Sequence, residues 1–66
     1  MANTDRTEVI EYDKHGQPNR TYRSKSKPEY YVTLYENRGY DLWRSTNTVV
    51  TMSNGKYRVT IEKLVP

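Results

Sequence analysis

The chain contains no cysteine and no phenylalanine, and only one of its 66 residues is a histidine. The lack of cysteine excludes disulfides and thiolate metal sites, and a single histidine cannot form a histidine cluster. No hydrophobic run approaches the roughly 18 apolar residues of a membrane-spanning helix, and the N-terminus lacks the apolar segment of a signal peptide. We therefore expect a cytoplasmic protein that uses no metal or other cofactor and makes no membrane contact.

Hydrophobic residues are also scarce, at 33% of the sequence. A domain of this size buries only about 60% of the surface that its unfolded chain exposes. Hydrophobic burial and lost conformational entropy then nearly cancel in a small scaffold. The chain must either pack a very efficient core or cover part of its surface with a partner, so a monomer and a homo-oligomer remain equally open.

Residues suited to catalysis are few. Histidine is the side-chain type best suited to acid–base catalysis near neutral pH, and the one histidine, His15, lies in a segment rich in turn-forming residues. The sequence contains no glycine-rich phosphate loop and no serine in a nucleophile-elbow pattern. These features predict a protein that is not an enzyme, in which His15 is an ordinary loop residue.

The clearest structural signal is a β-hairpin over residues 48–61. Asn54-Gly55 is a strong signal for a two-residue turn, because such a turn requires positive φ at its central positions. The resulting register places apolar residues on one face and mostly polar residues on the other, as in a half-buried antiparallel sheet. The predicted apolar pairs are Met52 with Tyr57, Val50 with Val59, and Thr48 with Ile61.

The N-terminal half predicts a second hairpin. Glu8–Tyr12 has the composition of a first strand, residues 13–19 are dense in turn formers, and residues 21–23 fit the returning strand. A linker over residues 24–28 then leads to Pro28, which suits the start of a strand.

Residues 29–35 alternate between strand-favouring side chains, and we expect a strand there. A helix over the same residues is the competing interpretation, which the β-branched and aromatic content disfavours. Residues 37–39 fit a three-residue hairpin loop with Gly39 in the left-handed conformation, and residues 40–45 fit the next strand, which sets Leu34 opposite Leu42.

Together these segments predict an all-β fold, a small antiparallel meander of about five to six short strands. Closure into an SH3-like or OB-like barrel remains open, because strand count and length fit both an open and a closed sheet. Residues 1–6 form a flexible N-terminus and residues 7–66 a single domain. Within it, residues 7–27 form the N-terminal hairpin with a basic segment, and residues 28–66 a four-stranded meander.

Charge is unevenly distributed along the chain. Residues 14–28 contain five basic residues and no acidic one, whereas residues 1–13 contain four acidic residues and one basic residue. A basic segment of this kind suits contacts with the phosphates of a nucleic acid. The alternative is that the two segments neutralise each other across the first hairpin, where such surface pairs contribute little stability. The candidate phosphate contacts are Arg20, Arg23, Lys25, Lys27, Arg44 and Arg58.

Seven tyrosines and Trp43 make up the aromatic content. We expect Tyr30 and Tyr57 to cover the core. Tyr31, Tyr35 and Trp43 fall on the face opposite Leu34, and we expect them to be exposed there as a partner face. Aromatic rings beside arginine and lysine stack on unpaired bases in single-strand binders, and tyrosine also provides contact area in protein-binding surfaces.

The sequence therefore favours a small, non-enzymatic nucleic-acid-binding module. The alternative is a protein–protein interaction module or inhibitor that docks through its tyrosine-rich face or an edge strand. Small chains without cysteine are common among phage-encoded inhibitors of host proteins, which is an association by size only.

Overall fold

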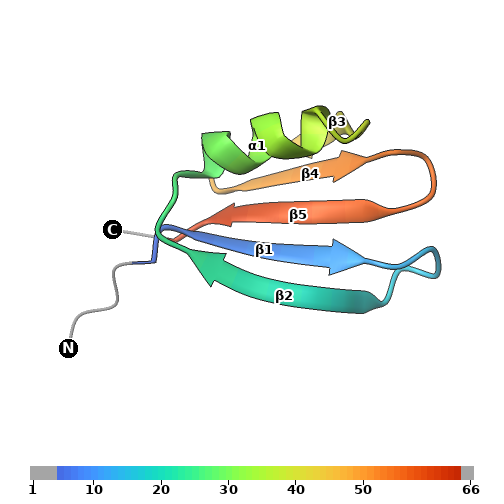
Figure 1. Ribbon diagram of the computed structural model, residues 1–66, viewed down its shortest axis with the longest axis horizontal. Coiled ribbons are helices and arrows are strands. Elements are labelled where there is room, and N and C mark those ends of the chain that lie inside the picture. Colours follow the sequence, from blue (N-terminus) through green and yellow to red (C-terminus); the bar gives the residue numbers. More distant parts are fainter. Residues whose placement is uncertain (1–4, 65–66) are drawn as a thin grey trace.

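The computed structural model describes residues 5–64, and these form one antiparallel sheet with a helix against one of its faces (Figure 1). Residues 1–4 of the segment that we expected to be flexible lie outside the described residues. The elements in chain order are β1 (Thr7–Tyr12), β2 (Pro18–Ser24), α1 (Pro28–Glu36), β3 (Asp41–Ser45), β4 (Val49–Ser53) and β5 (Arg58–Lys63).

The sheet confirms the predicted antiparallel meander of short strands. Its five strands follow the order β2-β1-β5-β4-β3, so β3, β4 and β5 form a continuous meander and β1 and β2 a hairpin beside it. Strands β2 and β3 are the two edges, and the sheet is open rather than closed into a barrel. The helix connects one edge to the other and packs against β4 and β5 (Figure 1).

The strand expected over residues 29–35 is wrong, because this segment is the helix α1. Pro28 occupies the first turn, where its missing N–H has no intrahelical partner to lose. Tyr31 and Tyr35 are four residues apart, so they share one helical face, and both are buried against the sheet. Burial of these two rings outweighs the strand preference of the individual residues.

The end of α1 replaces the hairpin loop that we expected at residues 37–39. Gly39 has a φ of +91°, which confirms its predicted left-handed conformation, but here it terminates a helix. The N–H of Gly39 donates to the carbonyl of Glu36, and the N–H of Tyr40 donates to the carbonyl of Tyr35, both at 3.0 Å. These two bonds form a Schellman motif, which satisfies the last carbonyls of the helix. The predicted pairing of Leu34 with Leu42 is therefore also wrong.

The hairpin of β4 and β5 has the predicted faces but a shifted register. Val50 pairs with Ile61 and Met52 with Val59, each partner lying two residues further along β5 than predicted. A shift of two residues keeps every side chain on its predicted face, because the strand period is two. The turn is centred on Gly55 and Lys56, and Gly55 has a φ of +91°, as the first central residue of a type II′ turn requires.

The core lies between the helix and one face of the sheet. Val9, Met52, Val59 and Ile61 from three strands pack with the two buried tyrosines of α1. Tyr30 and Tyr57 were expected to cover this core, but they are 58% and 37% exposed. Tyr30 immediately precedes the buried Tyr31 in the chain, so its ring lies on the outer side of the helix.

Candidate functional site

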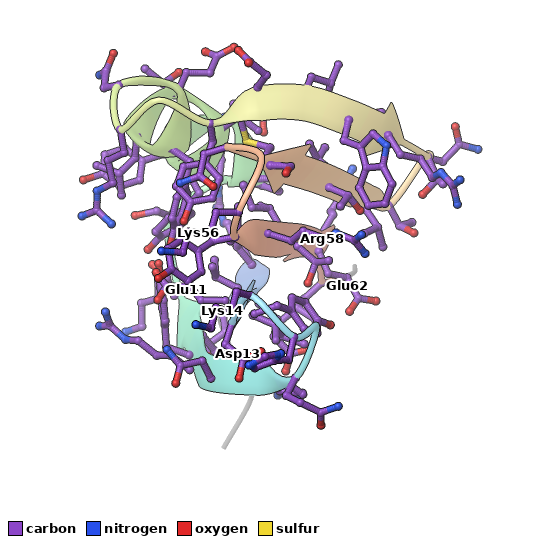
Figure 2. All side chains as sticks on the ribbon, turned by 90° about the vertical axis from the view of Figure 1, so that its right-hand side faces the viewer. Glu11, Asp13, Lys14, Lys56, Arg58 and Glu62 are labelled. Carbon is purple, nitrogen blue, oxygen red and sulfur yellow. The ribbon has the colours of Figure 1, made fainter. Side chains whose placement is uncertain are left out.

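The sheet has a second face, which the helix does not cover. Side chains alternate along each strand, so the residues between the buried core positions point away from α1. Figure 2 shows this difference: Arg58 and Glu62 point to the side away from the helix, and Glu11 points to the helix side. We call this second surface the open face. Its central residues are Ile10, Tyr12, Thr51, Arg58 and Thr60.

Trp43 is the most exposed large ring associated with this face, with 53% of its surface exposed. It lies at an irregularity of β3, where the pairing shifts between Leu42 and Arg44, and Thr51 is the partner of Arg44. A bulge of this kind leaves one residue unpaired and redirects its side chain. The sequence correctly predicted that Trp43 is exposed, but not the bulge that displays it.

Two arginines lie against the Trp43 ring. The guanidinium carbon of Arg58 is 4.2 Å from the ring centroid, and that of Arg44 is 5.8 Å away. Cation–π contacts of this kind contribute about 0.5–1 kcal/mol each at exposed positions. We call these three residues the Trp43 cluster. They were predicted separately as basic and aromatic candidates, and the fold brings them together from β3 and β5.

The remaining basic candidates are not part of this cluster. Arg23 makes an ion pair with Glu8, with 3.0 Å between its Nε and Oε2, as the alternative interpretation of the hairpin charges predicts. Arg20 lies over the ring of Tyr22, at 4.8 Å from its centroid. Lys25 and Lys27 follow β2 in the linker, and Lys27 is the residue that precedes the helix.

The expected aromatic face is wrong for two of its three members. Tyr31 and Tyr35 belong to the core, so neither ring is available to a partner. The hydroxyl of Tyr35 donates to the carboxylate of Glu11, and the hydroxyl of Tyr22 lies 2.9 Å from that of Tyr35. Desolvation and the hydrogen bond to Glu11 raise the pKa of Tyr35 well above its usual range, so it stays neutral.

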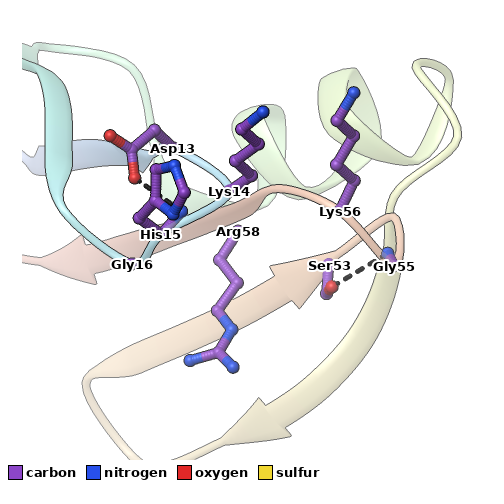
Figure 3. A pocket seen from close by; sticks show the side chains of 8 residues that line it. All are labelled: Asp13, Lys14, His15, Gly16, Ser53, Gly55, Lys56 and Arg58. Atoms are coloured by element: carbon purple, nitrogen blue, oxygen red, sulfur yellow. Dashed lines mark hydrogen bonds between the residues drawn. The ribbon is translucent and has the colours of Figure 1, made fainter.

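A hollow of about 340 Å³ lies between the β1–β2 loop and the β4–β5 turn, at one end of the sheet (Figure 3). Three cationic side chains line it, and we call it the loop-end hollow. A smaller hollow of about 210 Å³ beside Trp43 shares Ser53 and Arg58 with it. The sequence does not reveal this site, because Lys14 and Lys56 are distant in the chain. The cations that line it are Lys14, Lys56 and Arg58.

The loop-end hollow contains the one histidine of the chain. His15 is exposed, and its backbone N–H donates to the carboxylate of Asp13 at 2.8 Å. No group of three or more histidine, cysteine, aspartate or glutamate residues within residues 5–64 is arranged to hold a metal ion.

No protein-family model, curated protein or solved structure matches this chain. In the part of the chain that the structure describes, no helix has the length and hydrophobicity needed to cross a membrane.

Proposed function

We propose that this protein binds single-stranded nucleic acid on its open face, with an unpaired base stacked on Trp43. The observation that carries the proposal is the Trp43 cluster, in which an exposed indole lies beside two guanidinium groups on an uncovered sheet. Stacking on an aromatic ring and contact with backbone phosphates are the two interactions that single-strand binders combine.

The neighbouring surface supports this assignment. Thr51 and Thr60 are directly paired in the middle of the open face, and Ile10 is paired with Thr60 on the next strand. This row provides hydroxyls for hydrogen bonds beside a small apolar surface.

On the open face, Arg44 and Arg58 lie beside Trp43, where Asp41 is the one acidic residue that lines the adjacent hollow. Glu8 and Glu62 are directly opposite each other at the other end of β1 and β5, and Glu8 holds Arg23 in an ion pair. A phosphate backbone is repelled by these carboxylates and attracted by Arg44 and Arg58. The proposed site is therefore short and confined to one end of the sheet.

The first experiment follows Trp43 fluorescence during titration with single-stranded and duplex oligonucleotides of mixed sequence. Because Trp43 is the only tryptophan, its signal reports this site alone. We expect saturable quenching by single strands that weakens with salt, and weaker binding of the duplex, whose bases are already stacked. Binding is expected to weaken steadily between about 50 and 200 mM salt. The absence of quenching at both salt concentrations would contradict the proposal.

A pair of variants separates the ring from general charge attraction. Trp43→Ala is expected to weaken binding of a labelled single strand by about 1–3 kcal/mol, as for the loss of one stacked base. Tyr30→Ala removes an exposed ring from the opposite side of the molecule and serves as the control. Equal affinities of the two variants in fluorescence anisotropy would refute the role of Trp43.

A protein partner is the second candidate, and one observation favours it. Leu42 is 60% exposed beside Trp43 on the edge strand β3, and exposed apolar residues on an edge strand are typical of docking sites. Leu42 pairs with the core residue Met52 and therefore belongs to the helix side of the sheet. Leu42→Ala tests this alternative: loss of binding to a protein partner, with oligonucleotide binding unchanged, would favour docking at β3.

A further inference from the structure

The loop-end hollow continues from the Trp43 cluster around the end of the sheet. Arg58 and Ser53 line both this hollow and the smaller one beside Trp43. A strand with one base on Trp43 would therefore reach the hollow without crossing another element.

The charge of the hollow is positive. Its lining contains three cations, Lys14, Lys56 and Arg58, and one acidic residue, Asp13. None of the three cations makes an ion pair within the described part of the chain. In Figure 3, Lys14 and Lys56 extend in the same direction from their two loops, and Arg58 extends in the other. Lys14 and Lys56 therefore form a pair on one side of the hollow, and Arg58 lies on the side of the Trp43 cluster.

Both loops are held in place by hydrogen bonds to their own backbone. The carboxylate of Asp13 accepts the N–H groups of His15 and Gln17 at 2.8 and 3.0 Å, and these bonds help to lower its pKa. In the other loop, the side-chain oxygen of Asn54 accepts the N–H groups of Lys56 and Tyr57 at 3.0 and 2.7 Å. The backbone at Lys14 and Lys56 is thus fixed before a ligand binds.

We propose that the loop-end hollow binds a phosphate group of the same single strand whose base stacks on Trp43. This inference rests on the proposed function, and it assigns a role to Lys14 and Lys56 that the open face alone does not require. The bound group is a phosphate, either a free phosphate dianion or a phosphodiester of a strand. Because the hollow is continuous with the Trp43 cluster, the phosphodiester of a strand is favoured.

The test is the double variant Lys14→Gln/Lys56→Gln, with Arg6→Gln/Lys63→Gln as the control. The control removes the same charge from exposed side chains at the opposite end of the sheet. The oligonucleotide is a single-stranded oligothymidylate, and the salt dependence of its affinity is measured by anisotropy. Loss of this one phosphate contact is expected to reduce the slope of log K against log salt by about 0.7 in the hollow variant and to leave it unchanged in the control.

Trp43 quenching distinguishes the two proposals. We expect the quenching at saturation to be the same in wild type and in Lys14→Gln/Lys56→Gln, because the base still stacks. An unchanged salt slope together with normal quenching would overturn the phosphate assignment and leave the proposed function intact. Absence of binding by the wild-type protein would overturn both.

A second experiment identifies whether the bound phosphate belongs to a strand or is free inorganic phosphate. Amide resonances of Gly16 and Gly55, which line the hollow, are followed by NMR during addition of the oligonucleotide or of inorganic phosphate. The proposal expects shifts with the oligonucleotide and none with inorganic phosphate at the same concentration of phosphate groups. Shifts with inorganic phosphate and none with the oligonucleotide would contradict binding of a strand.

Discussion

At the scale of single residues, the side chain of Tyr35 contributes both apolar burial and two hydrogen bonds to the fold. It is 1% exposed, its ring packs edge-on against Tyr40, and its hydroxyl donates a hydrogen bond to Glu11. Because that proton is used, Tyr22 is the donor in the bond between the two tyrosine hydroxyls. This chain of three side chains connects the helix to β1 and β2.

Tyr35→Phe removes the hydroxyl and leaves the half-buried carboxylate of Glu11 without its donor. We expect the free energy of unfolding to fall by about 1–3 kcal/mol, as measured by urea denaturation at neutral pH. Tyr30→Phe, which changes an exposed ring, is the control and should alter stability by no more than about 0.5 kcal/mol. Equal stability of the two variants would show that the hydroxyl network contributes nothing.

The same variant has a characteristic pH dependence. Burial raises the pKa of Tyr35 in the folded state, whereas the unfolded chain titrates near the ordinary value of about 10. Above that pH the folded protein binds more protons than the unfolded chain, so its stability decreases as the pH rises. Stability should therefore fall above about pH 10 in the wild type and less steeply in Tyr35→Phe. A steeper fall in the variant would contradict the assignment.

At the scale of elements, the start of α1 is less stabilised than its end. Lys27 precedes the helix with extended backbone angles, which suit a capping residue, but its side chain makes no capping hydrogen bond. The C-terminus, by contrast, is closed by the Schellman bonds around Gly39. The helix therefore depends on its buried tyrosines more than on its own capping.

Lys27→Ser would provide the missing acceptor for a backbone N–H of the first turn. We expect the free energy of unfolding to rise by about 0.5–1 kcal/mol, measured by urea denaturation. Lys25→Ser removes the same charge two residues earlier, outside the helix, and controls for the change in net charge. A gain in both variants would point to charge rather than to capping.

The elements also show how far the sequence could predict the structure. Alternating apolar and polar residues and the Asn54-Gly55 pair predicted the faces of the β4–β5 hairpin, but the turn shifted by one position because Gly55 took the first central place. Residues 29–35 were wrongly predicted to form a strand, because a spacing of four between Tyr31 and Tyr35 places both rings on one face of either a strand or a helix. Contact of both rings with the sheet, which is not encoded locally, decides in favour of the helix.

The edge strands are protected from pairing with other chains. β3 is short and interrupted by the bulge at Trp43, and β2 begins with Pro18 and exposes Arg20 and Arg23. Bulges, prolines and charges are the devices that discourage edge-to-edge association. These features leave the open face, rather than an edge, as the principal surface for a ligand.

At the scale of the whole molecule, the fold separates a structural face from a face that we propose to be functional. The helix side holds the buried tyrosines and the core, and the open face carries the Trp43 cluster beside threonines. The candidate site could be predicted only in part. Trp43, Arg44 and Arg58 were each identified as candidates, but their proximity depends on strand order. Lys14 and Lys56 were overlooked as partners because their loops meet only in the folded sheet.

The most direct test of the central claim is to map the surface that contacts a single strand by NMR, using backbone amides and the indole N–H of Trp43. Our account predicts that a single-stranded oligonucleotide shifts the signals of Trp43, Thr51, Arg58 and Thr60, and leaves the outer side of α1 around Tyr30 unchanged. Shifts concentrated on the helix side, or no shifts at low salt, would contradict binding at the open face.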